Sequence, residues 1–298
     1  MMTNTMQQED LMAQLLANHP QVGRLAWFTV NDNMVDQQQW IQGVMNAGLT
    51  IYGQPHGIPA TTAYLRGLRA MQHAAGASTL IRRVEREKGR TVHHWIEETV
   101  AGGQVQFRPI AAITRYTKSD AMNVQRLDRL SSHEDDALSR LTEFVDTARN
   151  TYTPGDRRRQ IRSWFAGVGA IQMANAGPVQ FVPETAVTLI DALSQAQESL
   201  GLTMWSMPLT RSADVIGTLT QSLDAEVTKK TAALLKSVQK SREAGKTPTT
   251  GQQAKLVEQL HDLDTRIQRY AGLFGTQLDN LTGQIDIARK AVRGALEE

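Results

Sequence analysis

Residues 252–296 of the chain read QQAKLVEQLHDLDTRIQRYAGLFGTQLDNLTGQIDIARKAVRGAL. Their apolar residues recur at steps of three and four, which is the spacing of one face of a helix. The alternation has one doubled step of four, from Tyr270 through Phe274 to Leu278, which is a stutter in a heptad register. The pattern therefore predicts one long helix with a continuous apolar seam.

A second stretch with the same spacing precedes it, and it predicts a helix from Ser212 to about Glu243. Residues 245–251, GKTPTTG, separate the two helices with Gly and Pro, so the helices become antiparallel neighbours. We expect residues 211–298 to form a coiled-coil helical hairpin whose seam binds a second copy of the chain or a protein partner. The alternative is that both helices pack flat on the rest of the protein. The seam residues expected to bind a partner are Leu256, Leu260, Leu263, Ile267, Tyr270, Phe274, Leu281 and Ile285.

Upstream, residues 131–210 predict a small winged-helix-like module. A helix that begins near Ser132 is followed by a helix capped by Asp156, and then by the apolar stretch IQMANAGPVQFVP at 171–183, which suits a hairpin. In a winged helix the second helix enters the major groove, so cations at its start approach phosphates and bases. The alternative is a salt-bridged surface. The cations expected to bind nucleic acid here are Arg157, Arg158, Arg159 and Arg162.

The same stretch carries a resemblance. The motif from Ile161 to Trp164, IRSW, and the later GPVQFVP at 177–183 resemble segments of uncharacterised accessory proteins of phages and plasmids. Those proteins also have a helix, a turn into an extended segment and a long helical C-terminus. The resemblance implies a mobile-element setting and assigns no chemistry to any residue.

The sequence of residues 1–130 predicts an α+β domain. Its first elements are of the α/β type. Three extended runs at 79–87, 90–100 and 104–116 are separated by EKGR and AGG, which is the pattern of a three-stranded antiparallel meander. The segment 66–130 is basic, with 12 Lys or Arg and six Asp or Glu. Such charge attracts a phosphate backbone, although cations on an edge strand also prevent aggregation. The first hairpin contributes the candidate nucleic-acid-binding residues Arg82, Arg83, Arg86, Lys88 and Arg90.

An enzymatic alternative depends on the HHWIEE stretch at 93–98. His93 and Glu97 could ligate a metal, which would make the protein a metal-dependent nuclease or hydrolase. A solvated strand face with cross-strand pairs to arginines explains the same residues. The chain has no G-x-x-x-x-G-K-[ST] phosphate loop and no G-x-G-x-x-G dinucleotide motif, so we expect no cofactor.

Composition sets the remaining limits. The 298 residues carry a formal net charge of +2 and include no Cys, which excludes thiolate metal sites and disulfides. No apolar run reaches the length of a membrane span, so we expect a soluble cytoplasmic protein. Together these features predict a non-enzymatic interaction or assembly protein that binds DNA or RNA, or interferes with a host system. A structural subunit of a filament or particle is a further alternative.

Overall fold

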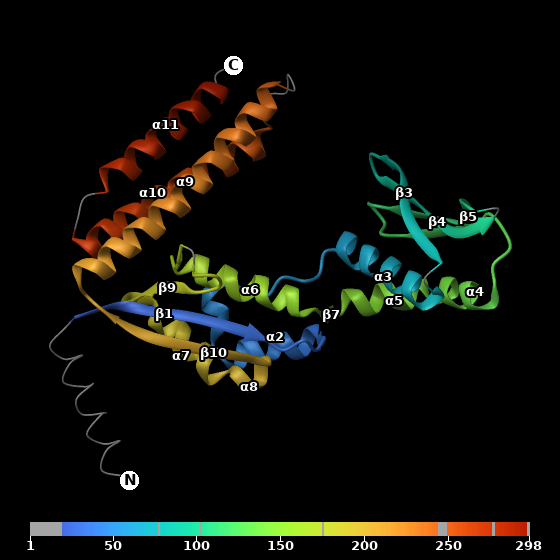
Figure 1. Cartoon of the computed structure of the whole chain (residues 1–298), viewed down its shortest axis with the longest axis horizontal. Helices are drawn as coiled ribbons and strands as arrows, with labels where there is room; N and C mark the ends of the chain where they lie inside the picture. Colours follow the sequence, from blue (N-terminus) through green and yellow to red (C-terminus); the bar gives the residue numbers. More distant parts are fainter. Residues whose placement is uncertain are drawn as a thin grey trace, which may run out of the picture. The chain divides into compact units, whose positions relative to one another are not determined.

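The computed structural model describes residues 20–76, 78–101, 103–174, 176–243, 249–275 and 278–296. The fold is mixed α+β, with 56% helix, 26% strand and antiparallel sheets. It divides into two compact units (Figure 1). Unit 1 consists of the described parts of Met1–Asn31, Val44–Gln54 and Arg158–Glu298, and unit 2 consists of those of Asp32–Gly43 and Pro55–Arg157. The segment 131–210, expected to form one module, is thus shared between the units.

Unit 1 is built on a four-stranded antiparallel sheet of order β10-β1-β9-β8. The strands are β1 (Gln21–Val30), β8 (Ile171–Gln172), β9 (Gln180–Pro183) and β10 (Leu202–Thr210). The predicted hairpin at 171–183 is therefore present as β8 and β9. Because β9 also pairs with β1, the hairpin is part of this larger sheet.

The C-terminal region of unit 1 contains three helices side by side (Figure 1). They are α9 (Ala213–Glu243), α10 (Thr250–Phe274) and α11 (Asp279–Leu296). The prediction of one continuous helix over 252–296 was wrong. α10 ends at Gly275, which adopts the left-handed conformation with φ of +65°. A residue in that conformation stops a helix, and glycine adopts it without a steric penalty. The break falls at the predicted stutter, and α11 then packs against both α9 and α10.

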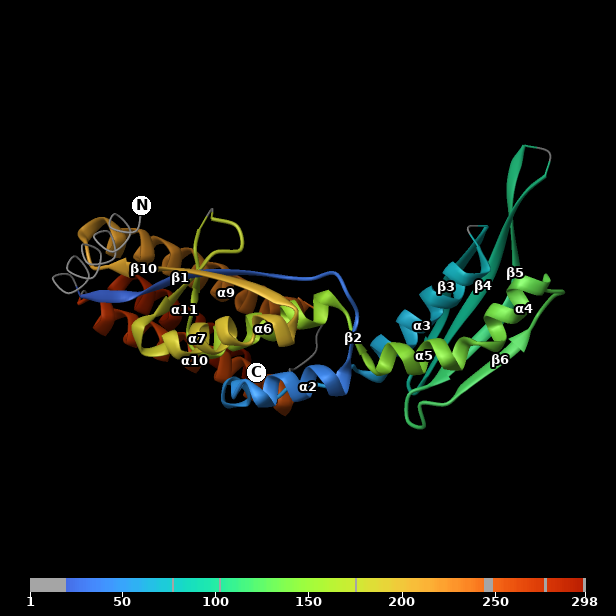
Figure 2. The ribbon, with the colours of Figure 1, turned by 90° about the horizontal axis from the view of Figure 1, so that it is seen from below.

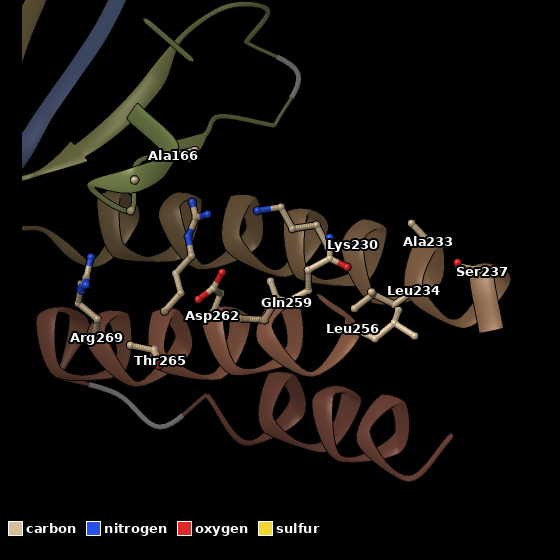
Figure 3. A pocket seen from close by; sticks show the side chains of 14 residues that line it. Ala166, Lys230, Ala233, Leu234, Ser237, Leu256, Gln259, Asp262, Thr265 and Arg269 are labelled. Carbon is tan, nitrogen blue, oxygen red and sulfur yellow. The ribbon is translucent and has the colours of Figure 1, made fainter. Parts of the chain in front are cut away.

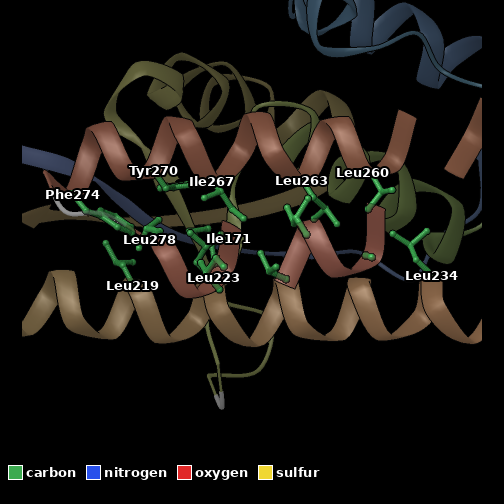
Figure 4. Close-up of a cluster of buried hydrophobic side chains, with 14 of the residues drawn as sticks. Ile171, Leu219, Leu223, Leu234, Leu260, Leu263, Ile267, Tyr270, Phe274 and Leu278 are labelled. Carbon is green, nitrogen blue, oxygen red and sulfur yellow. The ribbon is translucent and has the colours of Figure 1, made fainter. Parts of the chain in front are cut away.

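The apolar seam is the core of unit 1 (Figure 4). Leucines of α9 meet the seam residues of α10 and α11, and Val22, Ile171 and Phe181 of the sheet join the same cluster. All eight residues expected to bind a partner are at most 9% exposed. The expectation that they bind a partner was wrong, because these side chains are buried within their own chain and offer no free surface. Their burial agrees with the alternative, in which the helices pack on the rest of the protein.

The remaining elements of unit 1 pack against its sheet and against one another. Arg24 of β1 forms an ion pair with Asp191 at 2.9 Å, which connects the sheet to α7. The remaining elements of unit 1 are η1 (Leu49–Tyr52), η2 (Glu184–Ala186), α7 (Val187–Gln195) and α8 (Gln197–Leu200). Two further helices, α2 (Gln37–Asn46) and α6 (Pro154–Gly167), contain residues of both units. Among the described residues, no helix is long and apolar enough to cross a membrane.

Unit 2 contains the predicted meander. Its antiparallel sheet has the order β3-β4-β5-β6, and the first three strands match the expected runs closely. The strands are β3 (Thr79–Glu87), β4 (Arg90–Ala101), β5 (Gln104–Tyr116) and β6 (Met122–Arg126). A short pair, β2 (Val35–Asp36) and β7 (Thr151–Tyr152), completes the strands of this unit.

Three helices of unit 2 lie on one face of this sheet (Figure 2). They are α3 (Ala60–Ala75), α4 (Ser132–Ser139) and α5 (Leu141–Arg149). Trp95 and Ile113 of the sheet pack against Tyr64 and Leu68 of α3 in the core between them. Ser131 caps α4 through a capping box with Glu134, which satisfies two backbone donors at the helix start. We call this side of the sheet the helix face and the other side the open face.

Candidate anion-binding site

A cavity of about 600 Å³ lies within unit 2 where α3 begins and the β3–β4 hairpin turns. α3 contributes Thr61 and Tyr64 to its wall, and β4 contributes His93. Its basic lining residues are Arg83, Arg86, Lys88 and Arg115, and its one carboxylate is Glu87. The lining is therefore strongly cationic, which suits an anion.

An irregularity in β3 brings two of these cations together. Arg83 pairs with His93 and Arg86 pairs with Thr91, and the register shifts between Arg83 and Glu85. His93 and Thr91 are two residues apart on β4 and so lie on the same face of the sheet. Their partners, although three residues apart, must share that face as well. The extra residue is Val84, and without this bulge one of the two arginines would point to the open face.

These cations have little neutralising charge around them. In the part of the chain that the structure describes, no ion pair involves Arg83, Arg86 or Lys88, which we call the basic cluster. The lining carboxylate, Glu87, binds Arg90 at 3.3 Å. An anion entering the cavity would therefore meet positive charge that the protein itself does not satisfy.

The other two residues of the predicted basic run lie elsewhere. The guanidinium of Arg82 is 5.1 Å from the centre of the exposed Phe107 ring, and its strand partner is His94, so both arginine and ring are on the open face. Arg90 is bound by Glu85 and by Glu87. The structure thus brings three of the five predicted cations to the cavity.

His93 lines the cavity and is held by an aromatic contact with Tyr64. Its Nδ1 atom is 3.0 Å from the Tyr64 hydroxyl, and the two rings meet edge to face with centroids 5.4 Å apart. Only 6% of His93 is exposed. Burial, together with the charge of Arg83, holds the pKa of His93 below its usual value, so the ring is neutral at pH 7. Burial likewise raises the pKa of the Tyr64 hydroxyl, which stays protonated.

Arg115 supports this arrangement from β5. Its side chain is buried and binds Asp120 at 2.8 Å and the Thr61 hydroxyl at 3.1 Å. The guanidinium also lies 5.6 Å from the centre of the Tyr64 ring. Since Asp120 compensates its charge, Arg115 fixes the wall of the cavity and connects β5 to the start of α3.

The proposed metal pair is not assembled. His93 and Glu97 are four residues apart on β4, which corresponds to about 13 Å along a strand, whereas ligands of one ion lie only a few ångströms apart. Glu97 accepts a hydrogen bond of 3.0 Å from Arg108, and His93 is occupied at Nδ1. No group of three or more His, Asp or Glu residues able to hold a metal occurs among the described residues.

The prediction that the arginine triplet of α6 binds nucleic acid also needs correction. Arg157 is fully buried, donates a hydrogen bond of 2.5 Å to the Asn33 carbonyl, and lies 5.7 Å from the centre of the Trp40 ring. It is a core residue of unit 2 and cannot reach a nucleic acid. In unit 1, Arg158 reaches the Val30 carbonyl at 3.3 Å, whereas Arg159 and Arg162 are exposed.

A larger cavity of about 790 Å³ lies between the end of α6, α9 and α10 (Figure 3). Its three cations already have partners: Lys230 and Arg266 both bind Glu226, at 2.7 and 2.9 Å, and Arg269 donates to the Val168 carbonyl at 3.3 Å. Arg266 also donates to the Ala170 carbonyl, and the Tyr270 hydroxyl donates to the Gly169 carbonyl at 2.6 Å. These contacts hold α10 against the carbonyl groups that follow α6, which is a structural role.

Comparison with curated proteins and with solved structures finds no match for the chain. A protein-family model does match it, over residues 21–298, and this match includes both units. The chain therefore belongs to the Family of unknown function (DUF6744).

Proposed function

We propose that this protein is a non-enzymatic interaction protein that binds the phosphate backbone of a nucleic acid through unit 2. The observation that carries the proposal is the basic cluster of Arg83, Arg86 and Lys88 around one cavity, where the described residues supply it with no ion-pair partner. Phosphate contacts by Lys and Arg provide most of the affinity that does not depend on sequence. A cluster of unpaired cations is what such contacts need.

The position of β3 adds to this support. β3 is an edge strand of its sheet, so cations on both of its faces border one exposed edge. Arg82 lies on the open face of this strand, and Arg83 and Arg86 lie on the helix face. The simplest competing role is that these cations prevent edge-to-edge aggregation. That role does not require a bulge that turns two arginines toward a shared cavity.

The exposed aromatic side chains favour a single strand over a duplex. Phe107 is 51% exposed and Tyr116 is 40% exposed, and both are on the open face of β5, where Arg82 lies over the Phe107 ring. Unpaired bases stack on aromatic rings, and this stacking tolerates any sequence. A duplex hides the faces of its bases, so it would use only the phosphate contacts.

We leave α6 out of this surface, because Arg157 is a core residue and the hairpin that follows α6 belongs to the sheet of unit 1. We also infer that the three C-terminal helices support the rest of unit 1, since their seam is filled from within. Self-association would need a surface other than the seam. The mobile-element setting stays a prediction.

The test is binding of a fluorescently labelled single strand, measured by anisotropy at low salt. A triple variant with Arg83→Ala, Arg86→Ala and Lys88→Ala is expected to lose at least roughly tenfold in affinity, because each charged contact contributes on the order of 1 kcal/mol. A matched control removes the same charge from exposed lysines of unit 1 and should bind like the wild type. Its substitutions are Lys236→Ala, Lys240→Ala and Lys255→Ala.

Equal affinity of the triple variant and the wild type would remove the basic cluster from the binding surface. Equal losses in the triple variant and in the control would mean that only the net charge matters. Either result contradicts the proposal, provided that circular dichroism shows both variants to be folded.

A further inference from the structure

The Nε2 atom of His93 is a ring nitrogen of the cavity lining that can accept a ligand as its partner. The residue is nine-tenths buried, and its other ring nitrogen is held by Tyr64. For Nε2 no hydrogen bond exists with any residue that the structure describes, although His93 lines the cavity. The atom does not belong to the buried polar atoms that lack a partner, so solvent reaches it, and a ligand that enters the cavity can replace that water.

The hydrogen bond of Tyr64 decides what this atom offers. The Tyr64 hydroxyl is 3.0 Å from His93 Nδ1 and 3.5 Å from the Ile113 carbonyl, so the bond to the histidine is the shorter one. When the hydroxyl donates to Nδ1, the proton of the neutral ring is on Nε2. His93 then presents an N–H donor to the cavity.

The surroundings of this donor are also donors. Arg83 and Arg86 lie on the same face of the sheet as His93, Lys88 is in the adjoining turn, and Thr91 adds a hydroxyl. The cavity is also lined by Thr61 from the first turn of α3, a 16-residue helix whose start has no side-chain cap. The start of a helix carries partial positive charge and attracts phosphate groups.

A phosphate monoester fits this set of groups better than a phosphodiester does. A monoester has three terminal oxygens and a charge of about −1.5 to −2 at pH 7, so it can accept hydrogen bonds from several sides at once. A diester within a strand has two such oxygens and a single charge, and its chain must leave in both directions. A cavity whose lining offers several donors and cations suits a group that ends a chain.

We propose that this cavity holds the terminal phosphate of a nucleic-acid strand, with His93 Nε2–H donating to one phosphate oxygen and the basic cluster binding the others. The inference rests on the proposed function, because it places one end of the bound strand. It adds a ligand class, a phosphorylated end, and a recognition residue, His93. A 5′-phosphate and a 3′-phosphate share this chemistry, and the experiment separates them.

The experiment compares three labelled single strands of one sequence, with a 5′-phosphate, with a 3′-phosphate, and with hydroxyl groups at both ends. We expect the wild type to bind one phosphorylated strand roughly tenfold more tightly than the unphosphorylated strand, as a charged hydrogen bond implies. His93→Phe keeps a ring against Tyr64 but has no nitrogen. This variant should lose the preference and bind the phosphorylated and unphosphorylated strands with equal affinity.

A second measurement avoids substitution altogether. Inorganic phosphate is added to protein with ¹⁵N-labelled histidine, and the Nε2 signal of His93 is followed by NMR at pH 7.5. A saturable shift of this signal supports the inference, and an unchanged signal overturns it. Salt-dependent binding of all three strands with equal affinity would overturn the inference and leave the proposed function intact. No binding of any strand would overturn both.

Discussion

Gly67 provides the sharpest test of how unit 2 is packed. This residue is in the middle of α3 and faces α5. A Cβ atom added at Gly67 would lie 2.4 Å from Val145 Cγ2 and 2.9 Å from both the Cα and the N of Val145. Two of these three atoms belong to the backbone, so rotation of a side chain cannot relieve the clash. The two helices would have to move apart.

The magnitude follows from two opposing effects of Gly67→Ala. Alanine favours a helix over glycine by about 1 kcal/mol. Overpacking of a filled interface costs about 1–3 kcal/mol, and the backbone contacts of Gly67 place this site toward the upper end. We therefore predict a net decrease of about 1–2 kcal/mol in the free energy of unfolding of unit 2. Because Tyr64 is on the same helix, the cavity should be disturbed as well.

Urea denaturation followed by circular dichroism and tryptophan fluorescence measures this effect. The matched control is Gly217→Ala in α9, where an added Cβ would meet no atom within 4 Å. With helix propensity acting alone, this control should gain up to about 1 kcal/mol. If Gly67→Ala were as stabilising as Gly217→Ala, the close approach of α3 and α5 would be wrong.

Three further predictions concern other parts of the molecule. Tyr270→Phe removes a buried hydrogen bond to the Gly169 carbonyl and should lower the urea stability of unit 1 by about 1–3 kcal/mol, whereas an unchanged midpoint would contradict that contact. Gly275→Ala forces a left-handed conformation on alanine and should cost about 1–2 kcal/mol, and a stability gain would instead favour a continuous helix over α10 and α11. Burial lowers the pKa of His93 in the folded protein, so the unfolded chain binds more protons and stability should fall as the pH drops below about 6.5. His93→Phe should weaken this pH dependence, and an identical dependence in the variant would exclude His93 as a source.

Local sequence signals predicted much of the fold. Glycine-containing turns separate the runs 79–87, 90–100 and 104–116, and the structure places β3, β4 and β5 there. The apolar spacing after residue 252 identified the buried residues correctly. It could not identify their partner, because a seam that meets a sheet of the same chain has the same periodicity as one that meets another molecule. Gly275, which ends α10 at the stutter, was the available signal for a break.

The candidate site depends on contacts that the spacing of residues along the sequence cannot predict. Strict alternation along β3 would place Arg83 and Arg86 on opposite faces, and only the bulge at Val84 brings them together. Tyr64 is 29 residues before His93, so their hydrogen bond is a product of the packing of α3 on the sheet. Arg157 shows the opposite error. Its place in a basic triplet suggested a surface residue, whereas Trp40 and the Asn33 carbonyl enclose it in the core.

The central claim is that the basic cluster binds phosphates, and the salt dependence of single-strand binding tests it most directly. The logarithm of the association constant is plotted against the logarithm of the salt concentration for the wild type and for the variant with Arg83→Ala, Arg86→Ala and Lys88→Ala. Each lost phosphate contact lowers the slope on a single strand by about 0.7, so the variant should have a slope shallower by about 2. Parallel lines for the two proteins would contradict the claim.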